Sequence, residues 1–320
     1  MVMDNDQAEQ REGVKPTYKK IKGFNALKLT WKGLIVDAIF RSGEKHSNSG
    51  SAAKVMIQRV VKAIRQGYDS DVPIIIHMDS GFMDQKLFKV CEKLGIGYIC
   101  GGKLYTDIKD EMAKISPEDW ETYFAPGKNK EDRMWEYKEF EDQRGSWDES
   151  RRAIFTRPMS EDGQLLLPFT RPCTVIYTNL GKGYAVDEQL RNHQMEWLLT
   201  TYGIIYCYHD RGCSELTFRG FKDFGTEQLP FQKFILNAGF FHLMVLGFNL
   251  YEAFKEDVCQ GEISLTSYPE TLRRKIIDIG AKIVRTSHKN ILKLSKATFA
   301  SLNISKLWTR SNNPPIFQLA

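Results

Sequence analysis

The chain has 320 residues, which is long enough for one large domain with an insertion or for two domains. Its hydrophobic content of 42% and aromatic content of 12% support a packed core and exclude a mostly disordered chain. The formal net charge of +5 is modest, but it is unevenly distributed. Residues 107–149 carry fourteen acidic and seven basic side chains, whereas residues 261–310 carry ten basic and three acidic ones. A basic C-terminal segment can neutralise phosphates, although a solvated helix explains the same charges equally well.

Cysteine spacing and the N-terminal sequence indicate a cytoplasmic, reducing location. The six cysteines form no CxxC pair and no zinc-finger spacing, and apolar neighbours predict that Cys91 and Cys100 are buried thiols. The first residues are polar, unlike a signal peptide. The most apolar stretch, residues 231–254, contains lysine, glutamate, asparagine and histidine, which favours a buried amphipathic helix over a membrane span.

The first third of the chain predicts a mixed α/β sheet. A short strand at residues 2–6 precedes a hairpin at 25–41, which turns at Lys32-Gly33. The order of strand, hairpin, helix, strand, helix and strand matches a ribonuclease-H-like core, in which three antiparallel strands are followed by parallel ones. The later elements are a helix at 50–67, a doubly buried strand at 72–79, a helix at 84–94 and a strand at 97–100.

The rest of the chain predicts three further parts. Residues 106–126 have a helical pattern, and residues 131–180 contain short β-type runs that predict a small antiparallel region inserted into the core. Helical periodicity returns at residues 186–254, and basic segments follow at residues 270–310. The expected division is therefore a first core part at 1–105, a β-rich insertion at 106–182, a second core part at 183–258 and a basic C-terminal segment at 259–320.

Three aspartates near predicted strands are candidate metal ligands. Asp79 ends an apolar strand and is followed by Ser-Gly-Phe. Because ligands collect at the carboxyl ends of strands in open α/β sheets, an acid placed there suits a cation, although it can also simply cap the next helix. Asp4 and Asp6 lie two residues apart on the predicted first strand, so their side chains are expected on one face. Acids near a chain start are also common without any such role.

A polar helical stripe lies further along the chain. Tyr208, Arg211, Glu215 and Lys222 are separated by three, four and seven residues, which places them on one face of an α-helix. One carboxylate with two cations and a phenol suits the wall of a metal-dependent phosphate site. A solvated face with an Arg-Glu pair is the alternative from spacing alone.

These residues resemble a known family. The pattern Tyr-x2-Arg-x3-Glu-x6-Lys is similar to the signature of DDE transposases of the insertion-sequence-four type, and Met78–Phe82 (MDSGF) resembles their second-aspartate motif. More narrowly, the chain resembles the thirteen-eighty group over nearly its whole length. That similarity includes the Asp4-x-Asp6 pair, Glu12-Gly13, GFNAL at 23–27, Lys45-His46-Ser47-Asn48 and TNL at 178–180.

The resemblance implies a DNA transposase that cuts and rejoins DNA at insertion-sequence ends. It implies a ribonuclease-H-like fold with a β-rich insertion, and a triad of Asp6, Asp79 and Glu215 that holds two Mg2+ or Mn2+ ions. Asp4 is the alternative to Asp6, since relatives usually place the catalytic aspartate second in the pair. The implied partners are transposon ends and target DNA, with a homodimer in a synaptic complex, no membrane, and a bacterial cytoplasm where the DNA-bound enzyme associates with the nucleoid.

Further residues are expected to contact DNA. By resemblance, Tyr208, Arg211 and Lys222 contact phosphates near the cleaved end. An aromatic residue of the insertion could stack on a flipped base. Trp135 and Trp147 are the candidates, although packing is the more usual role for either one. The basic C-terminal segment adds Arg273, Arg274 and Lys275.

The resemblance has two departures. Relatives carry a DNA-binding region ahead of the first aspartate, whereas this chain begins close to it, and Gln7-Ala8 stands where many relatives have a small residue and threonine. One alternative is therefore a truncated, non-catalytic DNA-binding or dimerisation remnant. A ribonuclease-H-like nuclease with another substrate is a further alternative, although it has no need of the Tyr-Arg-Glu-Lys stripe.

Overall fold

The chain forms two compact units that are described separately below. The computed structural model describes residues 1–125, 134–159, 173–210, 212–286 and 289–313, and for residues 212–215 it describes the backbone alone. The sheet unit is Lys45–Gly212, and the split unit combines Met1–Glu44 with Cys213–Ala320.

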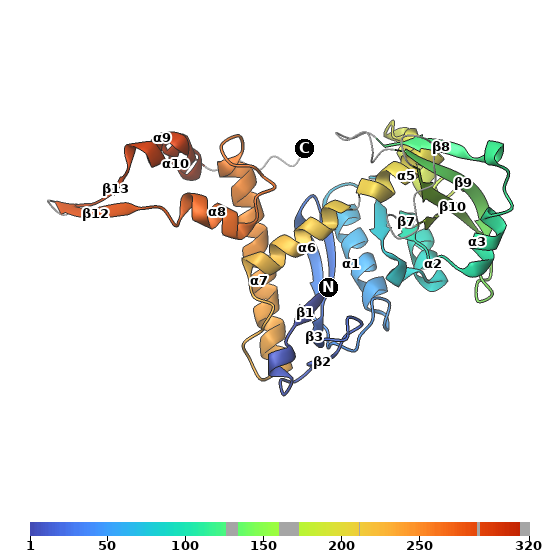
Figure 1. Ribbon diagram of the computed structural model, residues 1–320, viewed down its shortest axis with the longest axis horizontal. Coiled ribbons are helices and arrows are strands. Elements are labelled where there is room, and N and C mark those ends of the chain that lie inside the picture. The colour runs from blue at the N-terminus through green and yellow to red at the C-terminus, as the bar shows by residue number, and fades with distance from the viewer. Residues whose placement is uncertain (126–133, 160–172, 211, 287–288, 314–320) are drawn as a thin grey trace. The chain divides into compact units, whose positions relative to one another are not determined.

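The sheet unit is built on a mixed sheet of six strands in the order β6-β7-β11-β10-β9-β8 (Figure 1). β6 and β7 are parallel, and every other neighbouring pair is antiparallel. The strands are β6 (Ile75–Met78), β7 (Gly97–Gly101), β8 (Glu121–Phe124), β9 (Met134–Asp142), β10 (Arg151–Pro158) and β11 (Thr174–Thr178).

The parallel pair is joined by helix α2 (Gln85–Lys93), as the sequence predicts. The Asp84 side chain caps this helix by accepting the Lys86 N–H, and the helix buries Leu87, Phe88 and Cys91. β6 differs from its prediction: it is shorter, it ends the sheet, and only Met78 is buried.

The predicted antiparallel β region is confirmed by β9, β10 and β11. These strands do not form a separate sheet, because β11 pairs with β7 and so extends the sheet of the parallel strands. The predicted helix at 106–126 is confirmed only for α3 (Thr106–Met112), since the chain is again a strand at β8. The β-type run at 164–169 lies outside the described residues.

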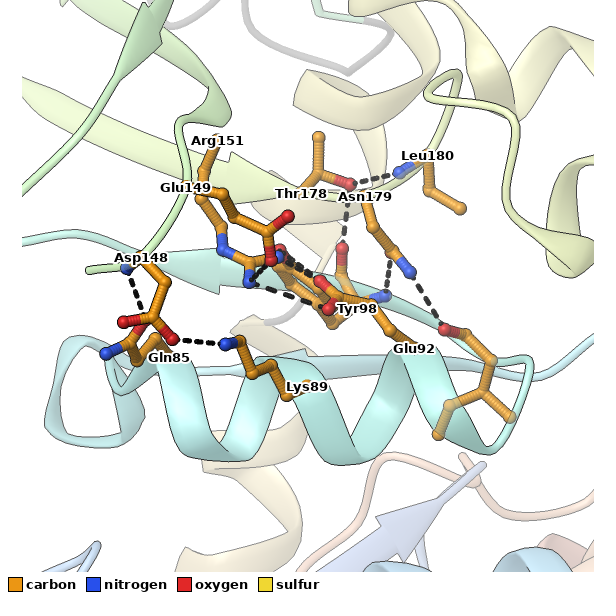
Figure 2. A network of polar contacts seen from close by, with 11 residues as sticks. Gln85, Lys89, Glu92, Tyr98, Asp148, Glu149, Arg151, Thr178, Asn179 and Leu180 are labelled. Carbon is orange, nitrogen blue, oxygen red and sulfur yellow. Dashed lines mark hydrogen bonds and ion pairs between the residues drawn. The ribbon is translucent and has the colours of Figure 1, made fainter.

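A buried arginine ties α2 and β7 to β10 (Figure 2). Arg151 is 3% exposed, forms an ion pair with Glu92 of α2, and donates to the Tyr98 hydroxyl of β7 at 3.1 Å. Burial raises the pKa of Tyr98 well above its usual value, so the phenol stays protonated. The outer nitrogen of Arg151 also pairs with the half-exposed Glu149 at 2.9 Å.

The remaining helices of the sheet unit are α1 (Ala52–Gly67), which precedes β6, and α4 (Ala185–Asn192) and α5 (Thr201–Asp210), which follow β11. Aromatic and aliphatic side chains of β7 to β11 pack against α4 and α5, around Leu190, Ile204 and Ile205. The unit also has 3-10 turns at Ser80–Phe82, Pro117–Asp119 and Glu196–Leu199.

The split unit carries the N-terminal strands in two small sheets, ordered β1-β3-β2 and β4-β5. The predicted hairpin is confirmed: β4 and β5 meet at Lys32 and Gly33, whose φ angles of 45° and 86° are those that a tight hairpin turn requires. The strands are β1 (Val2–Asp4), β2 (Lys15–Pro16), β3 (Lys22–Asn25), β4 (Leu27–Trp31) and β5 (Leu34–Ile39).

Among the described residues these strands and the parallel pair belong to different hydrogen-bonded sheets, and the pairing shows a mixed α/β fold. The helical part of the split unit packs its aromatic residues against the N-terminal strands. Its elements are α6 (Gly212–Phe224), α7 (Phe234–Phe254) with a π-helical turn at Lys255–Cys259, α8 (Pro269–Ile276), β12 (Ala281–Thr286), β13 (Lys289–Leu294), α9 (Lys296–Ser301) and α10 (Ile304–Asn312).

Helix α7 is less buried than the sequence predicts. One face packs into the split unit through Phe241, Met244 and Phe248, but Leu243 and Leu250 on another face are 67% and 64% exposed. Within the described part of the chain, Phe234–Cys259 is the one helical stretch whose length and composition would suit a membrane crossing, and core helices of soluble proteins meet the same criterion.

The Arg151 network predicts unequal effects for its two glutamates. Glu92→Ala leaves the buried guanidinium without its principal counter-charge and is expected to lower the free energy of unfolding by about 3–5 kcal/mol. Glu149→Ala removes a half-exposed partner of the same arginine and is expected to cost less than about 1 kcal/mol. Urea denaturation of both variants checks this, and equal losses would contradict it.

Candidate active site

Asp79 lies where the sequence predicts, directly after β6. It is exposed, and its Oδ1 accepts the Gly81 N–H at 2.9 Å, which begins the 3-10 turn Ser80–Phe82. Its carbonyl oxygen lies 3.5 Å from the Cys100 Sγ near the end of β7. The carboxylate is therefore held at the edge where the two parallel strands end, the usual place for a ligand in such a sheet.

Tyr208, the first residue of the predicted stripe, reaches the same sheet edge. It comes from α5, and its hydroxyl lies beside Gly101: a β-carbon built on this glycine would be 3.1 Å from that oxygen and 3.4 Å from the Ser80 nitrogen. A glycine at the end of β7 thus allows the phenol to lie next to the turn that follows Asp79. The structure brings these two predicted residues together within the sheet unit.

The segment before α1 also packs on this turn. Ser47 lies against Gly81, since a β-carbon on that glycine would be 2.8 Å from the Ser47 Oγ. Asn48 donates to the Asp84 Oδ2 at 2.7 Å. The sequence suggested this segment only through the resemblance, and spacing alone gives no reason to place it near Asp79.

Asp4 and Asp6 differ in a way that the sequence did not predict. β1 ends at Asp4, and Asp6 begins a 3-10 turn (Asp6–Ala8) that follows Asn5. The expectation that both aspartates lie on one strand is therefore wrong, because the strand is too short. The Asp4 Oδ1 accepts the Asp6 N–H at 2.9 Å, and the exposed Asp6 accepts the Lys22 N–H at 3.1 Å.

Lys222, the last residue of the stripe, lies near β1. Its Nζ is 2.6 Å from the Glu227 Oε2, and the same oxygen accepts the Asp4 N–H at 3.3 Å. Glu227 follows the end of α6 and connects the signature lysine to the first strand. No sequence pattern marks Glu227, since it lies five residues after Lys222 and beyond the helix.

A second lysine stands beside this group. The Lys28 Nζ lies 3.2 Å from the centroid of the Phe221 ring. Burial lowers the pKa of Lys28 well below its usual value, the charge of Lys222 lowers it further, and Glu227 acts in the opposite direction. Lys28 therefore adds less positive charge to this part of the split unit than its residue type suggests.

Two other predicted site residues are described only in part or not at all. Arg211 lies outside the described residues, and the structure gives only the backbone of Glu215, on α6. Helix α5 ends at Asp210 and α6 begins at Gly212. Asp79 belongs to the sheet unit, whereas Asp4, Asp6 and Glu215 belong to the split unit. Among the side chains that the structure describes, no three His, Cys, Asp or Glu residues are grouped as a metal site would require.

The predicted tryptophan and basic residues have distinct surroundings. Trp147 is 8% exposed and packs edge-on against Phe88 and Tyr177. Its ring is therefore part of the core and is not exposed for stacking on a base. Trp135 is half-buried against the His209 ring at 4.5 Å. Arg273, Arg274 and Lys275 are exposed in the last turn of α8.

Residues 4–311 match the protein family described as Transposase DDE domain group 1. The chain belongs to this family. The transposase chain is also similar to the piggyBac transposase, solved by cryo-electron microscopy as a synaptic complex with hairpin DNA, with a TM-score of 0.37 and 11% identity. The likeness covers 99% of this chain and 53% of the other, so this chain spans about half of that transposase. No curated protein matches the sequence.

The pairing of β1 with β3, which places Asp4, predicts that position 23 of β3 must be glycine. A β-carbon at Gly23 of β3 would lie 2.0 Å from the Met3 carbonyl oxygen, so Gly23→Ala must push β1 away from β3. We expect a loss of at least about 1–3 kcal/mol in the free energy of unfolding. The matched control is Gly67→Ala in α1, where an added β-carbon would meet no atom within 4 Å beyond its chain neighbours and its own helix backbone, and the change should be less than about 1 kcal/mol. Equal stability of the two variants in chemical denaturation would refute the argument.

Proposed function

We propose that this chain is the catalytic region of an insertion-sequence-four-type DNA transposase of the thirteen-eighty group, which cuts and rejoins DNA at insertion-sequence ends by a cut-and-paste route. The observation that carries the proposal is the family match over residues 4–311, combined with an exposed Asp79 at the end of two parallel strands. Its partners are the terminal repeats and target DNA, and it acts as a homodimer in the bacterial cytoplasm. The ribonuclease-H-like core and its insertion belong to the same proposal.

The donor chemistry of the proposed ligands suits Mg2+ or Mn2+. Asp6, Asp79 and Glu215 offer only hard carboxylate oxygens, and both Asp6 and Asp79 are exposed at their positions. When bound, two such ions supply an activated nucleophile and stabilise the leaving oxygen in phosphoryl transfer. The three carboxylates are the residues that would hold the ions.

The cationic and phenolic groups position the DNA. Lys222 and Arg211 bind phosphate oxygens beside the cleaved bond, and Tyr208 donates its hydroxyl at the edge that carries Asp79. Glu227 holds Lys222 close to the backbone of Asp4, so a phosphate on Lys222 lies near the first aspartates. Phosphoryl transfer then depends on orientation and charge more than on covalent catalysis by the protein.

Activity of the purified chain tests the triad. With Mn2+ or Mg2+ it should nick DNA that carries the element's ends, while Asp79→Asn and Glu215→Ala should each lose at least about a hundredfold in rate, since each change removes an ion ligand. Glu188→Ala, at an exposed glutamate of α4, is the matched control and should keep full activity. Wild-type activity in the Glu215 variant would refute the assignment, and binding without cleavage by the unaltered chain would favour the non-catalytic remnant.

The first aspartate can be identified by paired amide substitutions. Asp6→Asn should abolish cleavage, because it removes the charge of the proposed ligand. Asp4→Asn keeps an oxygen that can accept the Asp6 N–H, so it should retain most of the activity, whereas Asp4→Ala loses this cap and should be slower. Cleavage rates at saturating Mn2+ provide the measurement. Loss in Asp4→Asn with normal rates in Asp6→Asn would make Asp4 the ligand.

A further inference from the structure

Strands β12 and β13 form a two-stranded ribbon that is a sheet of its own (Figure 1). Every one of its residues is exposed or half-buried. An isolated two-stranded hairpin is only marginally stable in water, and like charges placed directly opposite each other weaken it further. The ribbon nevertheless places Lys282 directly opposite Lys293.

The register gives the ribbon two different faces. Residues that pair across an antiparallel ribbon share a face, and successive residues alternate. Lys282, Lys293 and Lys289 therefore lie on one face, where Lys289 is paired with Thr286 and the apolar pair of Val284 and Ile291 lies between the lysines. The opposite face presents Ile283 and Leu292, which are paired and are 72% and 62% exposed, together with the pair of Arg285 and Asn290.

The lysine face has no acidic partner within the described part of the chain. No acidic residue follows Asp278 in the sequence. Elsewhere in the same C-terminal region two basic residues are used internally: Lys306 pairs with Glu262 at 2.5 Å, and Arg310 donates to the Val258 carbonyl at 3.3 Å. None of the three ribbon lysines makes such an ion pair among the residues that the structure describes.

We propose that this lysine face is a binding site for the phosphates of double-stranded DNA. A two-stranded β-ribbon is narrow enough to enter the major groove, and lysines along one of its faces can reach phosphates without reading the base sequence. This inference rests on the proposed function, because it takes DNA to be the substrate, and it adds a second DNA contact away from the triad. Bound phosphates also relieve the repulsion between Lys282 and Lys293.

The test is DNA binding in EDTA, where cleavage does not contribute. Fluorescence anisotropy with two short duplexes of unrelated sequence compares the full chain with the triple variant Lys282→Gln, Lys289→Gln, Lys293→Gln. Each phosphate contact contributes about 0.9 to the slope of log affinity against log salt, so the slope should fall by about 2–3 and the affinity at ~0.1 M salt by about a hundredfold. Both duplexes should be affected equally.

Two matched variants test whether a loss of binding comes from the lysine face itself. One controls for the loss of positive charge, and the other controls for changes to the ribbon. The triple variant Lys62→Gln, Lys109→Gln, Lys114→Gln removes the same charge from exposed positions of the sheet unit and should bind with nearly wild-type affinity. The double variant Ile283→Thr, Leu292→Thr changes the opposite face and should also keep its affinity. Circular dichroism of each variant verifies folding.

The proposal is overturned if the ribbon triple variant binds DNA like the sheet-unit control, or if the double variant loses as much affinity as the ribbon variant. It is also overturned if the ribbon lysines are needed for co-sedimentation with vesicles of phosphatidylcholine and phosphatidylglycerol but not for DNA binding. The proposed function can fail without the ribbon proposal failing. If the chain binds DNA through the ribbon lysines but never cleaves it, the ribbon site is supported and the catalytic triad is contradicted.

Discussion

A strand in the interior of a protein needs a partner for each of its backbone polar groups, and β7 meets this requirement in an unusual way. All five of its residues are buried, with parallel β6 on one side and antiparallel β11 on the other. Side chains that follow or end β11 complete the pairing. The Asn179 amide accepts the Tyr98 N–H at 2.9 Å and donates to the Ile96 carbonyl at 3.0 Å, and the Thr178 hydroxyl donates to the Tyr98 carbonyl at 2.7 Å.

The position of the candidate site follows from this strand. The end of β7 carries the Cys100 thiol beside Asp79 and the glycine beside Tyr208, so a shift of β7 would move both contacts. Arg151 then fixes β7 to α2 and β10. The parallel and antiparallel parts of the sheet therefore act as one support for the Asp79 edge.

The acidic segment at residues 107–149 and the basic ribbon of β12 and β13 differ in whether their charges are paired within the chain. Within residues 107–149, Glu136, Glu139 and Glu149 form ion pairs with arginines of β10. Burial alone would raise the pKa of Glu139, but hydrogen bonds from Arg152 and Thr201 lower it. Arg157 similarly pairs with Glu136 at 2.5 Å. The lysine face of the ribbon forms no such ion pair among the described residues, so its charge is available to a partner.

The sequence predicted elements whose cause is local. The Lys32-Gly33 turn, helix α2 and the strand β7 were all predicted, because turn chemistry, helical periodicity and apolar runs lie within a few residues. It did not predict that β11 pairs with β7, since that contact joins residues that are far apart in the chain.

The candidate site was predictable to a similar extent. The position of Asp79 followed from its strand, whereas residue spacing alone could not place Ser47 or Glu227, because only the folded chain brings them to the turn and to Lys222. The contacts of Trp147 could not be predicted for the same reason, because its burial depends on Phe88 and Tyr177, which lie on other elements.

Asn179 also has a consequence for how the protein ages. Its side chain works as a substitute peptide group, with one atom that donates and one that accepts. Deamidation would replace the donating nitrogen by an oxygen that faces the Ile96 carbonyl, and the contact would become repulsive. A single hydrolytic event would thus damage the pairing of the buried strand β7 without any change in the encoded sequence.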